Sequence, residues 1–158
     1  MTAHAGAVCN SWYDYLTDFE GQQEDVACSH SLRISIFRVL RILHNIKHRY
    51  PDVPLLLGGI SQGGCVALEA AATDPCDAVF TIVSHRISSR RHRRIACPCS
   101  CLVAMDDSVF PSSWARDCLP ENCQVVEVHG DHWQENSAMV PFIENQIRSA
   151  MTRRQNAA

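Results

Sequence analysis

The sequence lacks any long run of apolar residues. No stretch approaches the roughly 20 apolar residues that a membrane-spanning helix requires, and Met1–Asn10 shows no sustained apolar run of the kind found in signal peptides. The formal net charge is only −3, so the composition gives no general attraction to nucleic acid or to anionic membranes. We therefore expect a cytoplasmic protein that binds no nucleic acid and does not insert stably into a membrane.

Cysteine, in contrast, is abundant, with nine residues in a chain of 158. The odd number and the lack of a signal peptide argue against a secreted disulfide framework. The cluster Cys97–Cys101 has C-x-C spacing, whereas zinc knuckles use C-x-x-C, and Cys118 and Cys123 would have to complete a zinc site from a distance. We favour free thiols, mostly buried as small apolar side chains, and expect no metal and no other cofactor.

The order of the apolar segments predicts an α/β fold with a mostly parallel sheet, because strands alternate with helices. After an irregular segment from Asn10 to Ala27, a helix is expected from Ser31, capped by Ser29 or Ser31 and ended by Pro51. Its apolar face should pack on the next strand, which is buried on both faces. The predicted strands are Val53–Leu57, Ala78–Val83, Cys101–Met105 and Gln124–Val128, and further helices are Gly63–Ala72 and one starting at Asn136 or Ser137.

The length fits one domain. In the last predicted helix, Val140, Ile143, Ile147 and Met151 share one face. We expect residues 1–158 to form a single domain in which residues 1–10 and 152–158 are flexible.

The most informative motif is the pentapeptide Gly59–Gly63, which reads Gly-Ile-Ser-Gln-Gly and matches G-x-S-x-G. This turn holds a serine clear of neighbouring atoms between a strand and a helix, and its flanking glycines avoid clashes. An apolar strand is predicted before it and an Ala-rich helix after it. Ser61 is therefore the candidate nucleophile, and the amide of Gln62, at the start of the helix, is the candidate oxyanion donor.

A nucleophilic serine needs a base and an orienting acid, which follow it along the chain in this kind of fold. Asp106 and Asp107 come after the third predicted strand, and His132 comes after the fourth. Parallel strands bring these positions to the sheet edge that carries Ser61. His132 is the expected base. His129 is the alternative base, and a reading as ordinary loop residues stays open; His85 is interpreted as a surface residue.

Five arginines crowd the segment Arg86–Arg94. A targeting or nucleic-acid-binding role is one interpretation. A solvated loop between two strands is favoured, because neither the net charge nor the flanking pattern supports the first interpretation.

Four blocks make the chain resemble the phospholipase/carboxylesterase family of α/β-hydrolases, which includes the acyl-protein thioesterases. Ser11–Asp14 is similar to a Trp-aromatic-Asp segment, Leu57–Gly64 to the GG-x-SQGG elbow, Asp107–Pro111 to the D-x-x-V-P segment and Gly130–Trp133 to the segment with the base. The resemblance implies an α/β-hydrolase fold and the triad Ser61, Asp107 and His132, with Asp106 as the reserve acid.

The chain departs from the family pattern at two places. Ala104-Met105 stands where the family has a glycine before the acid segment. Upstream of Trp12 we find no strand and no H-G-x-G loop for a second oxyanion donor, and His4-Ala5-Gly6 is too short to replace it. We therefore expect an N-terminally shortened α/β-hydrolase fold with an exposed sheet edge that a dimer or a partner chain would cover.

The resemblance implies a serine hydrolase of acyl esters or thioesters, of carboxylesterase, lysophospholipase or acyl-protein thioesterase type, acting on small-molecule or lipidated-protein substrates. The alternative is a catalytically weak or partner-dependent remnant that acts as a binding protein. Loss of one oxyanion donor typically costs about 3 kcal/mol in the barrier, which is the physical reason for the second hypothesis.

Overall fold

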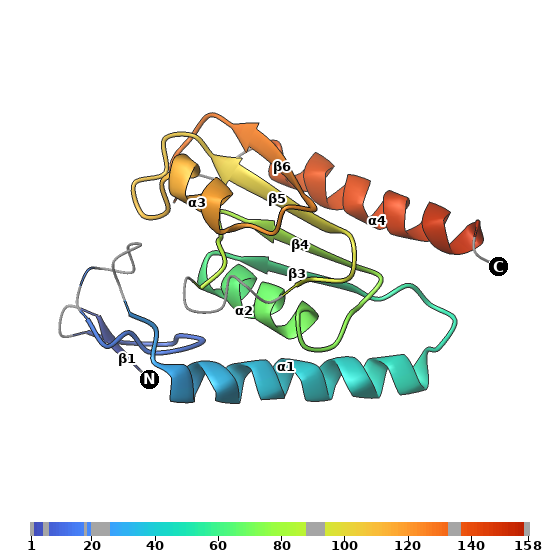
Figure 1. Cartoon of the computed structure of the whole chain (residues 1–158), viewed down its shortest axis with the longest axis horizontal. Coiled ribbons are helices and arrows are strands. Elements are labelled where there is room, and N and C mark those ends of the chain that lie inside the picture. Colours follow the sequence, from blue (N-terminus) through green and yellow to red (C-terminus); the bar gives the residue numbers. More distant parts are fainter. Residues whose placement is uncertain are drawn as a thin grey trace.

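The computed structural model describes residues 2–4, 7–17, 19, 26–87, 94–132 and 137–156. A four-stranded parallel sheet lies at the centre of these residues and has helices on both faces (Figure 1). Apolar side chains of α2 (Gln62–Ala71) and α3 (Ser112–Cys118) pack on one face. Those of α4 (Met139–Gln155) pack on the other. The predicted α/β architecture is confirmed, whereas α3 was not predicted from the sequence.

The sheet has the strand order β3-β4-β5-β6, and every neighbouring pair is parallel. Its register pairs Ile60 with Ile82, Ile82 with Leu102, and Ala104 with Val128. The carboxyl ends of all four strands therefore meet at one edge, the edge at which α/β proteins build their sites. The strands are β3 (Leu56–Ile60), β4 (Ala78–Ile82), β5 (Cys99–Ala104) and β6 (Cys123–Val128).

β3 differs from its prediction in both position and burial. It begins three residues later than expected and includes Gly58 and Gly59. A Cβ at Gly58 would lie 2.3 Å from the ring of Phe80, its partner on β4, so a larger residue there would displace this ring. Among the described residues β3 is an edge strand and Ile60 is 57% exposed. The expectation of burial on both faces was wrong for this reason.

The long helix α1 (Ser29–Arg49) ends just before Pro51, as predicted, but its N-terminus is not capped as expected. Cys28 occupies the N-cap position and makes no side-chain capping bond. The Ser31 hydroxyl instead donates to the Cys28 carbonyl, at 3.3 Å, and accepts the Asp14 amide, at 2.9 Å. Ser31 thus ties the segment before the helix to its first turn.

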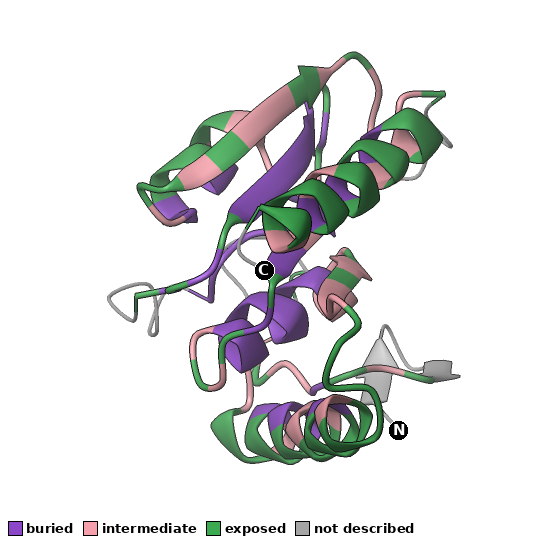
Figure 2. Ribbon diagram, turned by 90° about the vertical axis from the view of Figure 1, so that its right-hand side faces the viewer, coloured by how far each residue is buried: buried purple, intermediate pink, exposed green. Residues whose placement is uncertain are grey.

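α1 packs mainly against α2, whereas packing on the next strand was predicted; Leu57 of that strand only borders the cluster that the two helices form. Leu32 and Ile36 are buried in a cluster with Cys65, Val66 and Ala70 of α2. α2 lies between α1 and the sheet in both views (Figure 1 and Figure 2). The Ala-rich sequence of α2 explains this arrangement, because small side chains allow close packing on both of its sides.

α4 buries a different face from the one its apolar spacing suggested. Its buried side chains are Phe142, Gln146 and Ala150, whereas Val140 and Met151 are more than half exposed. The Phe142 ring meets Phe80 of β4 edge to face, with centroids 6.2 Å apart. The packing of the Phe142 ring on the sheet therefore decides which face of α4 is buried, more strongly than the spacing of the smaller apolar residues does.

Both ends of the chain contain more structure than expected. α4 continues through Thr152–Gln155, where a flexible tail was predicted, and Arg154 donates to the Val53 carbonyl at 3.4 Å. At the other end, β1 (Thr2–His4) and β2 (Ala7–Cys9) pair antiparallel, although no strand was predicted there. Asn136, one of the two expected starts of the last helix, lies outside the described residues.

Among the described residues, no helix combines the length and the apolar character that crossing a bilayer requires.

Candidate active site

Ser61 lies at the junction between β3 and α2, in a strained backbone conformation. Its φ is 50° and its ψ is −127°, a region that residues with a side chain rarely occupy. A Cβ at Gly59 would lie 2.5 Å from the carbonyl carbon of Gly63, so the turn closes only with glycine there. The structure thus has the tight strand–turn–helix junction that the G-x-S-x-G pattern predicts.

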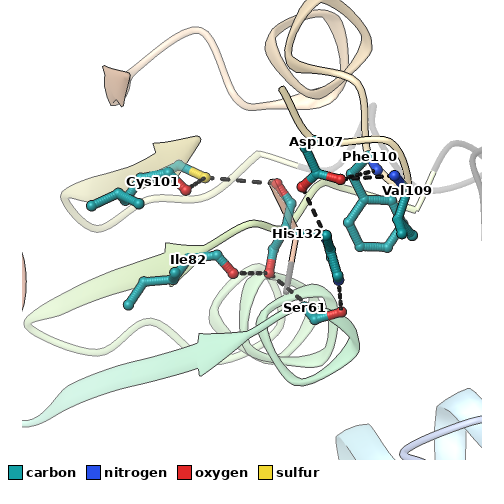
Figure 3. A network of polar contacts seen from close by, with 9 residues as sticks. Ser61, Ile82, Cys101, Asp107, Val109, Phe110 and His132 are labelled. Atoms are coloured by element: carbon teal, nitrogen blue, oxygen red, sulfur yellow. Dashed lines mark hydrogen bonds and ion pairs between the residues drawn. The ribbon is translucent and has the colours of Figure 1, made fainter. Parts of the chain in front are cut away.

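The Ser61 side chain meets His132, and His132 meets Asp107 (Figure 3). The Ser61 Oγ lies 2.8 Å from the His132 Nε2, and the His132 Nδ1 lies 2.9 Å from the Asp107 Oδ2. The side chains of the histidine and the aspartate are almost fully buried. In this arrangement the Nδ1–H donates to the carboxylate, and the Nε2 is left to accept the Ser61 hydroxyl proton.

The second carboxylate oxygen of Asp107 is also occupied. The Asp107 Oδ1 accepts the amides of Val109, at 2.9 Å, and of Phe110, at 2.7 Å. The loop after β5 therefore wraps around the carboxylate and fixes its plane, which in turn fixes the orientation of the His132 ring (Figure 3).

The alternative acid and base lie elsewhere. Asp106 is exposed and accepts the Gly130 amide at 3.2 Å, which joins the loops after β5 and β6. His129 is also largely exposed, and its Nδ1 lies 4.0 Å from Asp106. The structure thus brings together Ser61, Asp107 and His132 and leaves the two reserve residues at the surface.

Gln62, the predicted oxyanion donor, has a backbone amide at the start of α2 and a side chain that holds the segment before α1. As the first residue of α2, it carries a backbone amide that has no carbonyl to bond within the helix. Its side chain accepts the Trp12 amide at 2.7 Å and donates to the Tyr13 carbonyl at 2.8 Å. This anchoring of the segment before α1 was not foreseen, although Trp12 and Gln62 both fall in blocks that carry the resemblance.

His85 is buried next to the triad, so the prediction of a surface histidine was wrong. Its ring contacts Phe110 and Trp114, with centroids 4.2 and 4.1 Å apart, and Phe110 in turn contacts the ring of His132 edge to face. Burial lowers the pKa of His85 to about 4, although the Arg86 carbonyl, 2.8 Å from its Nδ1, acts against this shift. His85 is therefore a neutral member of an aromatic wall beside the base.

Ser84 supports the strained turn from below. Its hydroxyl lies 2.7 Å from the Ser61 carbonyl and 3.0 Å from the Ile82 carbonyl, and it donates to both. A Cβ at Gly64 would lie 2.0 Å from the Ser84 hydroxyl, so the second glycine of the pair Gly63-Gly64 gives the serine its space. Nothing in the sequence pattern marked Ser84.

Arg86 forms a buried ion pair with Glu69 of α2, with its Nε 2.9 Å from the Glu69 Oε1 and both side chains fully inaccessible. The interpretation of the basic segment as a solvated loop was therefore wrong at Arg86. Arg94 is exposed, as that interpretation requires. Arg90, Arg91 and Arg93 lie outside the described residues.

The described cysteines are free thiols, and most of them are buried, as predicted. A metal site would need several ligating side chains at one point, and the described ranges hold no group of three or more His, Cys, Asp or Glu residues so arranged. The expectation that no cofactor takes part stays a prediction.

The sequence matches no protein-family model and no curated protein. Solved structures, however, resemble it. The Zea mays acyl-protein thioesterase 2 has a TM-score of 0.71 at 13% identity, with 90% of this chain and 73% of that chain covered. A variant of Arabidopsis thaliana SOBER1 has a TM-score of 0.76 at 18% identity, with 93% and 77% covered. The Bacillus cereus carboxylesterase has a TM-score of 0.67 at 14% identity, with 89% and 68% covered.

Identities this low establish the fold alone. The shared features are the central parallel sheet and the helices on both of its faces. The chain therefore has the α/β-hydrolase fold, in a form similar to that of solved acyl-protein thioesterases and carboxylesterases.

Proposed function

We propose that the protein is a serine hydrolase that cleaves acyl esters or thioesters through an acyl-Ser61 intermediate. The observation that carries the proposal is the continuous chain of contacts from the Ser61 Oγ through His132 to Asp107. A strained serine, a base within hydrogen-bond reach and a buried carboxylate behind that base are the three requirements for an activated hydroxyl nucleophile.

The reaction would begin when His132 takes the Ser61 proton as the Oγ attacks the acyl carbonyl carbon. Negative charge would develop on the carbonyl oxygen. This oxygen would accept a hydrogen bond from the backbone amide of Gln62, at the positive end of α2. His132 would then give its proton to the leaving alcohol or thiol as its bond to the acyl carbon breaks. A water molecule, deprotonated by the same histidine, would release the carboxylic acid and restore Ser61.

Carboxylesterase, lysophospholipase and acyl-protein thioesterase activities all fit this chemistry, and the names of two similar structures support esters and thioesters as the substrate class. Two tryptophans that are at least partly exposed suit an apolar acyl group. Trp114 packs beside the buried Phe110, which contacts the ring of His132. The half-exposed Trp12 lies over Gly63 at the start of α2.

A fluorophosphonate probe tests the proposal, because it reacts covalently with an activated serine hydroxyl. We expect the full chain to be labelled and Ser61→Ala to abolish labelling. Ser108→Ala is the matched control, since Ser108 is an exposed serine next to the acid and should leave labelling intact. Hydrolysis of matched ester and thioester substrates with one acyl chain would then separate the two activities.

The opposite outcome is equally informative. A wild-type protein that is folded by circular dichroism but takes up no probe would overturn the enzymatic proposal. It would favour the alternative of a catalytically weak fold that binds acyl groups or a partner without turning them over.

A further inference from the structure

Pairs of cysteines lie at the amino end of the sheet, opposite the edge that carries Ser61. Cys99 and Cys123 are the first residues of β5 and β6. Cys76 and Cys97 lie just before β4 and β5. All four belong to the apolar cluster between the sheet and the helices α2 and α3. None of them contributes to the proposed hydrolase mechanism.

Cys99 and Cys123 have the geometry that a disulfide requires. They are direct register partners on adjacent parallel strands, and their sulfur atoms are 3.1 Å apart. Neighbouring strands are about 4.8 Å apart, which falls inside the range of roughly 4.4–6.8 Å for the Cα atoms of disulfides. A bond of about 2.05 Å needs the sulfurs to approach by only about 1 Å, which side-chain rotation at two strand ends provides.

The two thiols differ in access to solvent. Cys123 is partly exposed, whereas Cys99 is only 3% exposed and lies behind it. A soluble oxidant can therefore reach Cys123 first, with Cys99 placed to attack from within. The contact with Cys99 and burial raise the pKa of the Cys123 thiol, so the first step should accelerate at alkaline pH.

We propose that Cys99 and Cys123 form a reversible dithiol–disulfide site that low-molecular-weight disulfides, such as glutathione disulfide, oxidise. The Cys123 thiolate attacks one sulfur of glutathione disulfide, forms a mixed disulfide and releases one glutathione thiolate. Cys99 then loses its proton and attacks the Cys123 sulfur, which releases the second glutathione. The two protein thiols lose two electrons and two protons, and glutathione disulfide is reduced to two molecules of glutathione.

The bond would close the loop from Cys99 to Cys123, which contains Asp107 and α3. Such a cross-link restricts the unfolded chain much more than the folded one, in which the two sulfurs are already in contact. The oxidised protein should therefore unfold at a temperature higher by on the order of 10 °C.

Cys76 and Cys97 are the competing pair, with sulfur atoms 3.9 Å apart. The hydrogen bond from Cys76 lowers the pKa of Cys97 to about 6, which would favour its thiolate. Both residues are buried, however, at 8% and 4% exposure, so a bulky disulfide cannot reach them without local opening. Access to solvent therefore favours Cys99 and Cys123 over Cys76 and Cys97.

The experiment incubates the full wild-type chain with glutathione disulfide under native conditions, blocks the remaining thiols and maps cross-linked peptides by mass spectrometry. We expect a peptide that joins Cys99 to Cys123, a rise in the unfolding temperature, and reversal of both by dithiothreitol. In Cys123→Ser, glutathione disulfide should no longer raise the unfolding temperature. Cys97→Ser is the matched control in the competing pair, and its unfolding temperature should still rise.

Peptide mapping of the wild-type protein does not depend on whether either variant folds. A cross-link between Cys76 and Cys97 alone, a stable glutathione adduct on Cys123, or no reaction of the folded protein would each overturn the proposal. None of these outcomes bears on labelling of Ser61, so the two proposals can fail separately.

Discussion

His132 is held by Asp107 through one carboxylate oxygen only. The Asp107 Oδ2 lies 2.9 Å from the His132 Nδ1, while the Oδ1 is taken by the amides of Val109 and Phe110. The carboxylate cannot turn without losing two backbone hydrogen bonds. The orientation of the proposed base is therefore fixed by the loop after β5.

Replacement of Asp107 by asparagine should abolish most of the activity without unfolding the protein. The amide oxygen would keep the bonds to Val109 and Phe110, so the NH₂ group would face His132 and donate to its Nδ1. The imidazole would then carry its proton on Nε2 and could not accept the Ser61 proton. We expect kcat for an activated ester to fall about 10⁴-fold.

Asp106→Asn is the matched control, because Asp106 is the neighbouring exposed carboxylate. Its kcat should stay within about threefold of the wild type, since Asp106 bonds the Gly130 amide and lies near the exposed His129, and touches neither Ser61 nor His132. Equal losses in the two variants would contradict the assignment of Asp107.

The strain at Ser61 should appear as a stability difference between two inactive variants. Ser61→Ala and Ser61→Gly both remove the hydroxyl, but only glycine adopts a φ of 50° at low cost. We expect Ser61→Gly to be more stable than Ser61→Ala by about 1–2 kcal/mol, measured by urea unfolding. A less stable glycine variant would show that the turn stores little strain.

Acid should destabilise the protein through His85. Its pKa is lowered to about 4 in the folded state from an ordinary value of 6.5, so between these two pH values only the unfolded chain binds the proton. The free energy of unfolding should fall by about 3 kcal/mol as the pH falls from 6.5 to 4, and the contribution is retained above pH 6.5. Urea unfolding at a series of pH values measures it.

His85→Phe keeps an aromatic ring between Phe110 and Trp114 and removes the titrating group. Other groups titrate in the same range, so the informative quantity is the difference in slope between the two proteins. A variant whose stability falls as steeply with acid as that of the wild type would rule out His85 as the cause.

Loss of one member of the buried pair Glu69–Arg86 should be severe. Glu69→Gln would remove the negative charge of Glu69 from beside the guanidinium of Arg86, in a fully inaccessible site. We expect a loss of about 3–5 kcal/mol in the free energy of unfolding. The double variant Glu69→Leu/Arg86→Met should lose less free energy of unfolding than Glu69→Leu and Arg86→Met lose when added together. The double variant removes both charges, whereas each single variant leaves one of them buried.

The exposed pair Lys47–Asp74 provides the comparison. Its N–O distance is also 2.9 Å, but solvent screens both charges, so Lys47→Met should change stability by at most about 1 kcal/mol. Similar losses at the two pairs would show that burial does not set the cost.

The sequence predicted the α/β architecture well where local chemistry decides the structure. Pro51 ends α1, and the Ala-rich run after Ser61 forms α2. Ser61, Asp107 and His132 could be placed at one sheet edge because parallel strands share the direction of their carboxyl ends.

The errors concern properties that depend on distant neighbours. Phe142, rather than the apolar spacing of α4, sets the face that is buried, because it has a partner in Phe80. Arg86 appeared to belong to a solvated basic run, but Glu69, 17 residues before it, draws it into the core. His85 was placed at the surface because its aromatic partners come from a loop and a helix that the sequence pattern did not reveal.

The anchoring of Trp12 and Tyr13 by Gln62 has a consequence for the order in which the protein folds. These two bonds join residues 50 and 49 positions apart, so a long loop must close before either forms. The backbone of the turn around Ser61 is held by closer partners, because the Ile82 carbonyl accepts its amide and the Ser84 hydroxyl donates to its carbonyl. We therefore expect the turn to form before the segment that precedes α1 is fastened to it.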